Sequence, residues 1–506
     1  MGRRPIFYNA LMLTGVNLLL RLVSTSFQVF LSGRVGAAGI GLMQLVMSVS
    51  MMSMTAGNAG VRTASMYLTA EELGKKRPQN VSWILSGCVM YSLIFSLSVA
   101  AAVFGFAPQI AARWIGDMRT VSSIRLFAAF LPVSCLSGVM VGYFTAANRI
   151  GALAAVEVVE QFCSMGFTAC ALLFWAGNDL ARACQSVVLG GCAGSGLTLC
   201  SLVVLRVLER PRTGVRISVA RRLTTVALPL AVADDLKVGI TTLENMMVPK
   251  RLARYYEPGE AMAQFGTVCG MVFPVLMFPA AILYGLADLL IPEMARCNAS
   301  GSQTRIHYLT RRSLRLALIY GAVCGGILFL MAEPLSLSIY RSNRAGQYLR
   351  WFSLLAPMLY SDAIIDAINK GRGKQKICVR INIFTSVLDV AGLYILLPLW
   401  GMEGYFISFF ISHGVNIILS LTLLLRTSGI AIPLSVPMRT VAVMGGGIIV
   451  AEMVPFFWMK GLIFLVICFC GLYLTGVISG EDLIWVIDLT GVRKKRKNFD
   501  FLQNNI

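Results

Sequence analysis

The stretch that decides the fold runs from Val16 to Gln28 and reads VNLLLRLVSTSFQ. It lies within an apolar run of the length that crosses the hydrocarbon core of a membrane, about 20 residues. A helix places Asn17, Arg21, Thr25 and Gln28 on one face, because they recur at intervals of three or four residues. An arginine at membrane depth is costly and faces a protein interior or a water-filled cavity. The stretch therefore predicts a membrane helix with an inward polar stripe.

The composition extends this prediction to the whole chain. Hydrophobic residues make up 57% of the sequence and charged residues 13%, and the mean hydropathy is +0.74, well outside the range of soluble domains. We expect an all-α polytopic membrane protein. Hydropathy predicts about 14 transmembrane helices, at 6–32, 37–69, 81–106, 121–143, 154–176, 183–206, 223–249, 263–292, 313–338, 348–369, 377–399, 404–425, 439–458 and 462–479.

We attribute the net charge of +20 to membrane topology and not to the binding of nucleic acid. With these spans, the basic clusters fall on one side of the membrane, at 75–77, 210–222, 305–315, 370–376 and 493–497. Lysine and arginine accumulate on the cytoplasmic side, so both termini are expected in the cytoplasm. The family resemblance described below implies that the membrane is a bacterial plasma membrane. The same basic face is expected to contact anionic lipid.

The chain divides into two similar blocks of spans. We predict an N-lobe at 1–208 (spans 1–6), a C-lobe at 209–426 (spans 7–12), two extra spans at 427–479, and a basic cytoplasmic tail at 480–506. The segment 18–34 aligns with 234–251 at a constant offset, which pairs Arg21 with Lys237, Gln28 with Glu244 and Arg34 with Lys250. Repeats separated by six spans have the same orientation, as in transporters built from parallel repeats.

Further polar residues lie within the predicted spans. The second span carries Asn58 and Arg62, and the seventh carries Asp234, Lys237 and Glu244. Because acidic groups in a cavity are natural cation sites, we regard four carboxylates as candidates for coupling transport to a proton or sodium ion: Glu157, Glu160, Asp234 and Glu244. The alternative is that these charges only pair across helices, as Asp234 and Lys237 would at a spacing of three.

Other charged residues at membrane depth are interpreted as structural. Asp389 and Glu452 stand alone in their spans, Asp362 and Asp366 precede Lys370, and His413 suits a packing role. No metal-binding pattern, nucleotide loop or catalytic motif is found, so we expect no cofactor, no metal and no enzymatic activity. Transport would then be driven by an ion gradient, by the membrane potential or by the gradient of the substrate.

Four stretches resemble the multidrug/oligosaccharidyl-lipid/polysaccharide flippase superfamily, and more closely its stage V sporulation protein B and polysaccharide biosynthesis branch. They are RLVSTSFQVFLSGRVGAAGIGLMQLV (21–46), LPLAVADD (228–235), LIPEMARCNASG (290–301) and LLPLWGMEGYFISFFIS (396–412). The resemblance implies two six-helix lobes around a central cavity, two extra carboxy-terminal helices, and alternating access.

The resemblance also implies which residues bind substrate. In the peptidoglycan-precursor flippases of the superfamily, arginines in the first two spans bind the diphosphate of the lipid-linked substrate, and Arg21, Arg34 and Arg62 match them here. The family also has an arginine in the eighth span, which 263–292 lacks, so we expect Lys237 to substitute. Arginine suits this role because it binds phosphate bidentately.

Three functions compete. The first is a flippase that moves a lipid-linked oligosaccharide or peptidoglycan precursor, for the cell wall or the spore envelope. The second is a cation-coupled multidrug antiporter of the same fold, which would favour acidic residues over arginine in the first span. The third is a non-transporting envelope or sporulation assembly factor. A glycan ligase is least favoured, because its expected large external loop is missing from the predicted topology.

Overall fold

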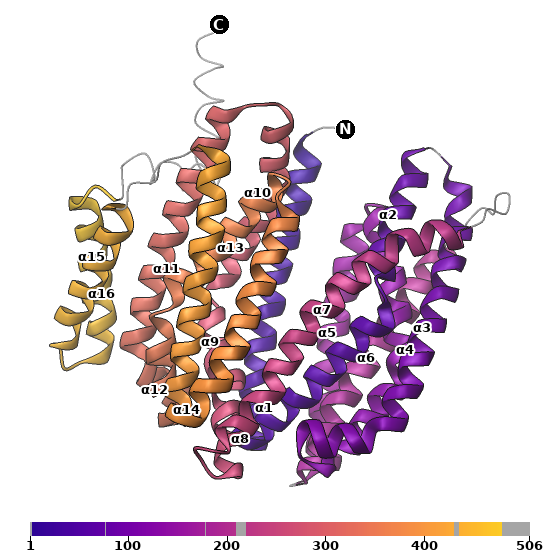
Figure 1. Ribbon diagram of the computed structural model, residues 1–506, viewed down its shortest axis with the longest axis horizontal. Coiled ribbons are helices and arrows are strands. Elements are labelled where there is room, and N and C mark those ends of the chain that lie inside the picture. Colours follow the sequence, from indigo (N-terminus) through magenta and orange to yellow (C-terminus); the bar gives the residue numbers. More distant parts are fainter. Residues whose placement is uncertain (1–2, 76, 178, 209–218, 430–434, 478–506) are drawn as a thin grey trace, which may run out of the picture. The chain divides into compact units, whose positions relative to one another are not determined.

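The computed structural model describes residues 3–75, 77–177, 179–208, 219–429 and 435–477, which are helical throughout and contain no strand (Figure 1). The basic tail predicted at 480–506 and the middle of the basic loop before α7 lie outside the described residues. Contacts divide the chain into two units. Unit 1 comprises residues 1–278 and 386–409, and unit 2 comprises residues 279–385 and 410–506. The predicted lobe boundaries stay a prediction.

The helices of unit 1 are the following, with a 3₁₀- or π-helical turn marked η: α1 (Arg3–Asn58), α2 (Val61–Gly74), η1 (Pro78–Asn80), α3 (Val81–Gln109), η2 (Ile110–Ile115), η3 (Met118–Thr120), α4 (Val121–Ala146), α5 (Ile150–Ala171), η4 (Leu172–Ala176), α6 (Leu180–Leu208), α7 (Ala220–Leu252), α8 (Pro258–Thr267), η5 (Val268–Val272) and α9 (Phe273–Met277). Unit 2 contains α10 (Ala280–Ala299), α11 (Gln303–Tyr340), α12 (Asn343–Ser353), α13 (Ala356–Gly371), α15 (Ser435–Glu452) and α16 (Phe457–Leu474). The long helix α14 (Gln375–Ser428) contributes residues to both units.

The described helices fit a membrane protein. Eight of them are long and apolar enough to cross a membrane, or nine if the bent pair α12–α13 counts as one span. Helices suit this environment because they satisfy their own backbone hydrogen bonds where no water is present. The all-α polytopic prediction is confirmed, and the number of about 14 spans stays a prediction.

Two of these helices are each long enough for two crossings. Helix α1 has 56 residues and α14 has 54, which at 1.5 Å per residue is about 80 Å, more than twice the thickness of a hydrocarbon core. Each contains one glycine with non-helical backbone angles, Gly36 (φ 73°) in α1 and Gly401 (φ 54°) in α14. These breaks fall where the sequence predicts one span to end and the next to begin.

The second predicted span is interrupted, although the sequence predicts it as continuous over 37–69. Helix α1 ends at Asn58, and Ala59 and Gly60 have φ values of 42° and 72° before α2 begins. A Cβ atom on Gly60 would lie 2.3 Å from the backbone oxygen of Ala227 in α7, so only glycine fits both the space and the left-handed conformation. The phenol of Tyr91 donates a hydrogen bond to the backbone oxygen of Ala59 at 3.2 Å, which holds the break in place.

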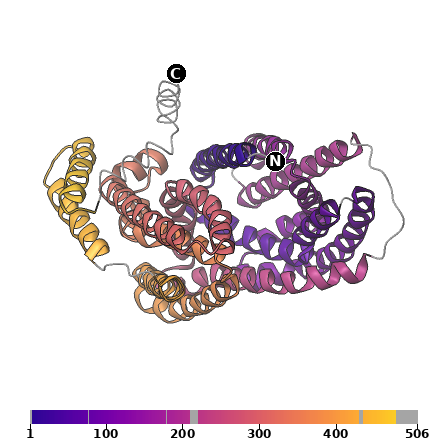
Figure 2. The same cartoon turned by 90° about the horizontal axis from the view of Figure 1, so that it is seen from above.

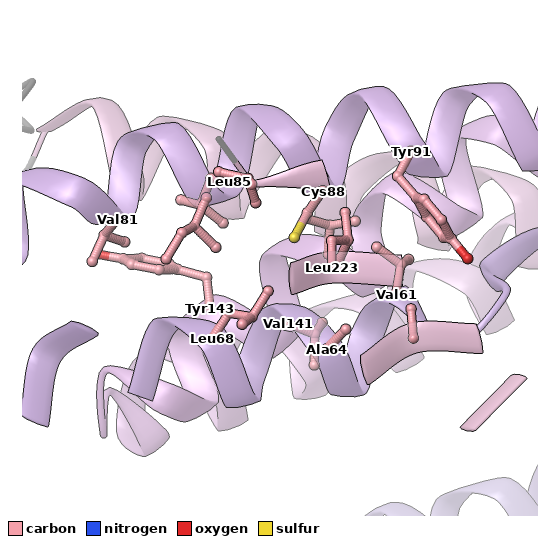
Figure 3. Packing of buried hydrophobic residues seen from close by; sticks show 14 of the residues in the cluster. Val61, Ala64, Leu68, Val81, Leu85, Cys88, Tyr91, Val141, Tyr143 and Leu223 are labelled. Carbon is pink, nitrogen blue, oxygen red and sulfur yellow. The ribbon is translucent and has the colours of Figure 1, made fainter. Parts of the chain in front are cut away.

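The core of unit 1 is packed around this interruption. Helices α2, α3, α4 and α7 contribute apolar side chains that interdigitate (Figure 3), among them Val61, Leu68, Cys88 and Leu223. Such side chains are packed at the density of organic crystals, so α2 is held firmly against its neighbours. The residues at the start of α2 are therefore positioned by a rigid scaffold.

In unit 2, the last two helices form a hairpin. Helices α15 and α16 lie side by side, as the yellow pair in Figure 2 shows, and both contact α11. Gly326 of α11 makes the contact with α16 possible, since a Cβ atom there would lie 2.0 Å from the ring of Phe464. The helices predicted at 439–458 and 462–479 are thus present and packed against a preceding helix of the same unit.

Candidate functional site

The polar stripe of the first span lies on the first half of α1. Arg21, Thr25 and Gln28 are all half-buried, whereas Leu22 and Ser26 on the other side of the helix are exposed. The hydroxyl of Thr25 donates to the backbone oxygen of Arg21 at 2.9 Å. The position of the Asn17 side chain lies outside the described residues. These three side chains thus share one half-buried environment, and their role as a substrate-binding stripe stays a prediction.

Other elements of unit 1 approach this stripe. The amide of Gln161 in α5 donates to the hydroxyl of Ser24 at 3.3 Å. Near the other end of the stripe, a Cβ atom on Gly270 of η5 would lie 3.4 Å from the amide nitrogen of Gln28. The α1 stripe therefore has polar neighbours on α5 and close backbone neighbours on η5, which gives it a defined place within the unit.

Arg62 is positioned by the break between α1 and α2. It lies in the first turn of α2, where its side chain is exposed, and Glu157 of α5 is close enough to interact with it electrostatically. Asn58, just before the break, has a buried side-chain oxygen that accepts no hydrogen bond from the described residues. Gly138 packs against this oxygen, since a Cβ atom added to Gly138 would lie 3.2 Å from it. This contact explains why the oxygen of Asn58 is buried. Sequence analysis predicted no break here, and Gly60 is the residue that marks it in the structure.

The two carboxylates predicted on α5 have different surroundings. Glu160 accepts a hydrogen bond of 2.5 Å from the hydroxyl of Thr198 in α6. Glu157 has Arg62 and Glu160 as its charged neighbours. A neighbouring cation favours the charged form of a carboxylate, and a neighbouring carboxylate favours its protonated form. Glu157 has one neighbour of each kind, which suits a proton acceptor. The charge state of Glu157 is therefore the more sensitive of the two to neighbouring charges. Glu160 is held in place by its hydrogen bond to α6.

On α7, the predicted charges are not paired with each other. Asp234 and Lys237 are both exposed, and no ion pair joins them among the described residues. The same helix is fixed to α1 by Thr242 and Asn245, which donate to the backbone oxygen and the hydroxyl of Ser48 at 3.3 and 3.0 Å. The alternative explanation, that Asp234 and Lys237 neutralise each other, has no support in this geometry.

Glu244 of α7 forms a carboxyl pair that sequence analysis missed. It hydrogen-bonds to Asp389 in the part of α14 that belongs to unit 1. Asp389 in turn accepts a hydrogen bond of 2.9 Å from the hydroxyl of Ser408, and only 5% of its surface is exposed. Two carboxyl groups form a hydrogen bond only when one carries a proton, and a bound cation could replace that proton. Asp389 is therefore not an isolated residue, and nothing in its sequence neighbourhood indicated its partner.

Arg34 lies apart from these contacts. It is exposed and lies two residues before the break at Gly36. All the predicted substrate-binding and ion-coupling residues belong to unit 1, on α1, α2, α5 and α7. The contacts given above join Arg62 to Glu157 and Glu244 to Asp389.

The charged residues predicted in unit 2 are paired. Asp366 binds Lys370 at 2.5 Å, and Asp362 accepts a hydrogen bond of 2.9 Å from Asn416. Glu452 is not isolated either, since it binds Arg350 at 2.6 Å and Lys460 at 2.7 Å. The Asp366–Lys370 pair lies within α13, whereas the contacts of Asp362 and Glu452 join different helices of unit 2.

Unit 2 also contains an apolar cavity of about 760 Å³ between α11, α13, α14 and α15. Leu318, Ile417 and Met444 are among its lining residues, and Arg311 and Arg315 line it from the first half of α11. Sequence analysis assigned these two arginines to the cytoplasmic side only as topology signals. The cavity combines an apolar wall with two cations, as an amphiphilic anion requires.

Comparisons with known proteins agree with this geometry. The chain is 23% identical over 389 residues to the stage V sporulation protein B of Bacillus subtilis (strain 168), a match that covers 73% of this chain and 74% of that protein. The fold is similar to a solved structure of the lipid II flippase MurJ in an inward closed conformation, with a TM-score of 0.69 and 11% identity over 91% of this chain and 98% of the other. It is also similar to an inward-facing multidrug resistance MATE family transporter of the MOP superfamily, with a TM-score of 0.67 and 14% identity over 82% of this chain and 98% of the other.

These structural likenesses show the fold, and the predicted resemblance to the flippase superfamily and its sporulation branch is confirmed. The family itself is shown by a sequence model, described as lipid II flippase MurJ, that matches residues 66–469. Because that match spans most of the sequence, the chain belongs to the lipid II flippase MurJ family.

Proposed function

We propose that this chain is an alternating-access flippase that moves a lipid-linked oligosaccharide or peptidoglycan precursor across the bacterial plasma membrane. The observation that carries the proposal is Arg21, a cation on the half-buried polar stripe of a membrane-length helix. Membership of the lipid II flippase family supports it. As in other members of such a family, transport and not catalysis is the expected activity.

We assign the diphosphate of the substrate to the cationic residues of unit 1. A diphosphate that leaves water loses its hydration, and charged hydrogen bonds from protein cations replace it. Arg21, Arg34, Arg62 and Lys237 supply these cations, and Asn17, Gln28 and Asn58 supply neutral polar groups. The buried oxygen of Asn58 that lacks a donor suits a sugar hydroxyl or a water molecule.

Transport would be coupled to a proton or a sodium ion bound by the candidate carboxylates Glu157, Glu160, Asp234 and Glu244. Glu244 has the surroundings that fit this role best, because it shares a hydrogen bond with Asp389. Replacing the four carboxylates by amides is expected to remove the dependence of transport on the ion gradient. Unchanged ion dependence in that variant would leave these residues as structural partners.

The basic face of the protein is proposed to lie in the cytoplasm together with both termini, where it contacts anionic lipid. Cysteine labelling in intact cells tests this topology. Cysteines in place of Lys75 and Lys374 should be protected from an impermeant reagent, and cysteines in place of Lys250 and Arg341 should react. Labelling of both pairs from the same side would contradict the proposed topology.

A multidrug antiporter of the same fold is less well supported. Such a protein would use carboxylates to attract cationic drugs, but the first 70 residues contain no aspartate or glutamate. The first span thus carries Arg21 and no acidic residue. A role in envelope or sporulation assembly without transport would not explain Lys237, which is exposed and forms no ion pair with the described residues.

Reconstituted vesicles with a labelled lipid-linked precursor test the proposed function. We expect Arg21→Ala to lower the rate of flipping by about tenfold or more, because a charged hydrogen bond contributes about 1.5–3 kcal/mol. Arg21→Lys should lose less, since it keeps the charge without the bidentate geometry. Arg341→Ala, at an exposed helix end in unit 2, is the matched control. Wild-type flipping by folded Arg21→Ala would show that Arg21 is only structural.

A further inference from the structure

A second cationic pocket lies in unit 1 at the carboxy-terminal end of α7. It has a volume of about 490 Å³, within the range of small-ligand sites. Met52 of α1, Trp114 of η2 and one side of α7 from Gly239 onward line it, and the lining continues to Arg254 in the turn that follows the helix. None of the residues assigned above to the diphosphate or to ion coupling lines this pocket.

The pocket changes character along α7. Leu243, Met246 and Met247 make its walls apolar within the helix, together with Met52 and Trp114. Three cations follow at the helix end: Lys250, Arg251 and Arg254. An apolar groove that opens beside a cluster of cations has the polarity of an amphiphile with an anionic head.

The three cations have no carboxylate partner within the described part of the chain. The ammonium of Lys250 donates to the backbone oxygen of Arg113, and the guanidinium of Arg251 lies over the ring of Tyr394, 3.1 Å from its centroid. Arg251 is nevertheless 92% buried, with 8% of its surface exposed, and it is close enough to Arg254 for electrostatic repulsion. Lys250 and Arg254 are exposed, so the cluster combines one buried cation with two that solvent or a ligand can reach. Burial of Arg251 next to a like charge is unfavourable unless an anion compensates it.

Stabilisation of the helix end accounts for part of this arrangement. Cations in the last turn of a helix interact favourably with its dipole, which applies to Lys250 and Arg251. It does not explain Arg254, which lies beyond the last turn, or the apolar groove beside the cations. A ligand that is both apolar and anionic explains the two features together.

We propose that this pocket binds an anionic phospholipid from the leaflet at which α7 ends. Its phosphate would lie among Lys250, Arg251 and Arg254, and one acyl chain would lie along Leu243, Met246 and Met247. Trp114 stands beside this pocket, and tryptophan is enriched where membrane lipid meets water. The site is independent of the proposed substrate site, because its residues and its ligand are different.

Native mass spectrometry of the full chain in detergent, titrated with phosphatidylglycerol or phosphatidylcholine, tests the proposal. We expect phosphatidylglycerol to bind preferentially, and the variant Lys250→Gln with Arg254→Gln to bind it about tenfold more weakly, since two charged contacts are lost. Arg341→Gln, which removes an exposed arginine elsewhere, should bind like the wild type. Equal affinity for the two lipids, or unchanged binding by the double variant, would overturn the proposal.

A second variant keeps every charge and tests the acyl chain. Gly239 lines the pocket and has open space around it, so Gly239→Leu should fill the groove without disturbing its neighbours. We expect weaker binding of phosphatidylglycerol and an unchanged unfolding temperature. Inorganic phosphate is the competing ligand. If it displaces phosphatidylglycerol at equal concentration, or if Gly239→Leu binds the lipid normally, the cations bind phosphate alone and the lipid assignment is wrong.

Discussion

Glu452 in unit 2 and Lys237 in unit 1 show two ways in which a membrane protein treats a charged side chain. Glu452 binds cations from two other helices, Arg350 of α12 and Lys460 of α16, at 2.6 and 2.7 Å. Lys237 forms no ion pair among the described residues, although Asp234 is only one turn away, and its side chain is exposed. The charge of Glu452 is thus satisfied within the protein, whereas the charge of Lys237 is available to bind a ligand.

The difference teaches where to look for function. Ionisable groups at membrane depth are costly, so a charge that a neighbour satisfies needs no further explanation, whereas an unsatisfied charge calls for a ligand. Arg62 belongs with Lys237 in this respect, because within the described ranges it forms no ion pair and interacts with Glu157 through electrostatic attraction. We therefore expect variants of the two groups to fail in different ways, in transport for unit 1 and in stability for unit 2.

The largest effect is expected for Arg62→Ala combined with Lys237→Ala. Each loses a charged hydrogen bond to the substrate, about 1.5–3 kcal/mol, so flipping should fall by about a hundredfold. The thermal unfolding temperature should stay near that of the wild type, because neither side chain has an ion pair to lose. The measurements are precursor flipping in vesicles and thermal unfolding in detergent, with Arg341→Ala as the control. A variant that unfolds early and flips normally when folded would break the comparison.

The next effect is expected for Glu452→Gln, which should lower the free energy of unfolding by about 1–2 kcal/mol. Two charged hydrogen bonds are weakened, but about a third of the side chain is exposed to solvent in the described protein, which reduces the effect. Flipping per folded molecule should not change. Thermal unfolding and the vesicle assay measure the two quantities.

Glu333→Gln is the matched control, because Glu333 makes a single contact of 3.7 Å with the same Arg350 and is 60% exposed. It should change the free energy of unfolding by less than about 0.5 kcal/mol. If Glu452→Gln is stable but does not flip the precursor, then paired charges also serve transport. The division between the two kinds of charge would then be wrong.

The stripe of the first span shows what the sequence could predict. Helical periodicity places Arg21, Thr25 and Gln28 together, and the structure gives all three the same half-buried environment. Periodicity suffices here because the contacts lie within one helix. The long apolar helices are predicted by hydropathy, because the hydropathy of a segment indicates whether it can cross a membrane.

The pair of Glu244 and Asp389 shows what the sequence could not predict. The two residues are far apart in the chain, and their contact requires the segment 386–409 of α14 to pack with unit 1. The break before Arg62 was missed for a related reason. Hydropathy does not register Gly60, whose need for a close approach to α7 exists only in the packed structure.

The smallest effect is expected at Asp117, in the turn between η2 and η3, where its one cationic partner, Arg119, is 59% exposed to solvent. Burial acts to raise the pKa of this carboxyl, but its hydrogen bonds with Arg119 outweigh burial and bring the pKa below the ordinary value of 3.8. A carboxylate with a lowered pKa stabilises the folded protein above its ordinary value, and this stabilisation is lost as the pH falls through the pKa of the folded state. Asp117→Asn should cost less than about 1 kcal/mol at neutral pH, because exposed pairs contribute little and asparagine also caps a helix.

The difference in unfolding temperature between Asp117→Asn and the wild type should therefore be small at pH 7 and should vanish below the pKa of the folded state, which lies under 3.8. Asp117 is 20% exposed and has one partner, Arg119, which is 59% exposed and lies at 2.7 Å. Glu452 is 33% exposed and has two less exposed partners at similar distances, Arg350 at 38% and Lys460 at 21%. Comparison with Glu452→Gln therefore measures what the number and burial of the cationic partners add. If Asp117→Asn costs as much as Glu452→Gln, these two properties of the partners do not decide the strength of the pairs. An unpaired, exposed Lys237 would then be no more remarkable than any surface lysine, and the case for its role in transport would rest on the flipping assay alone.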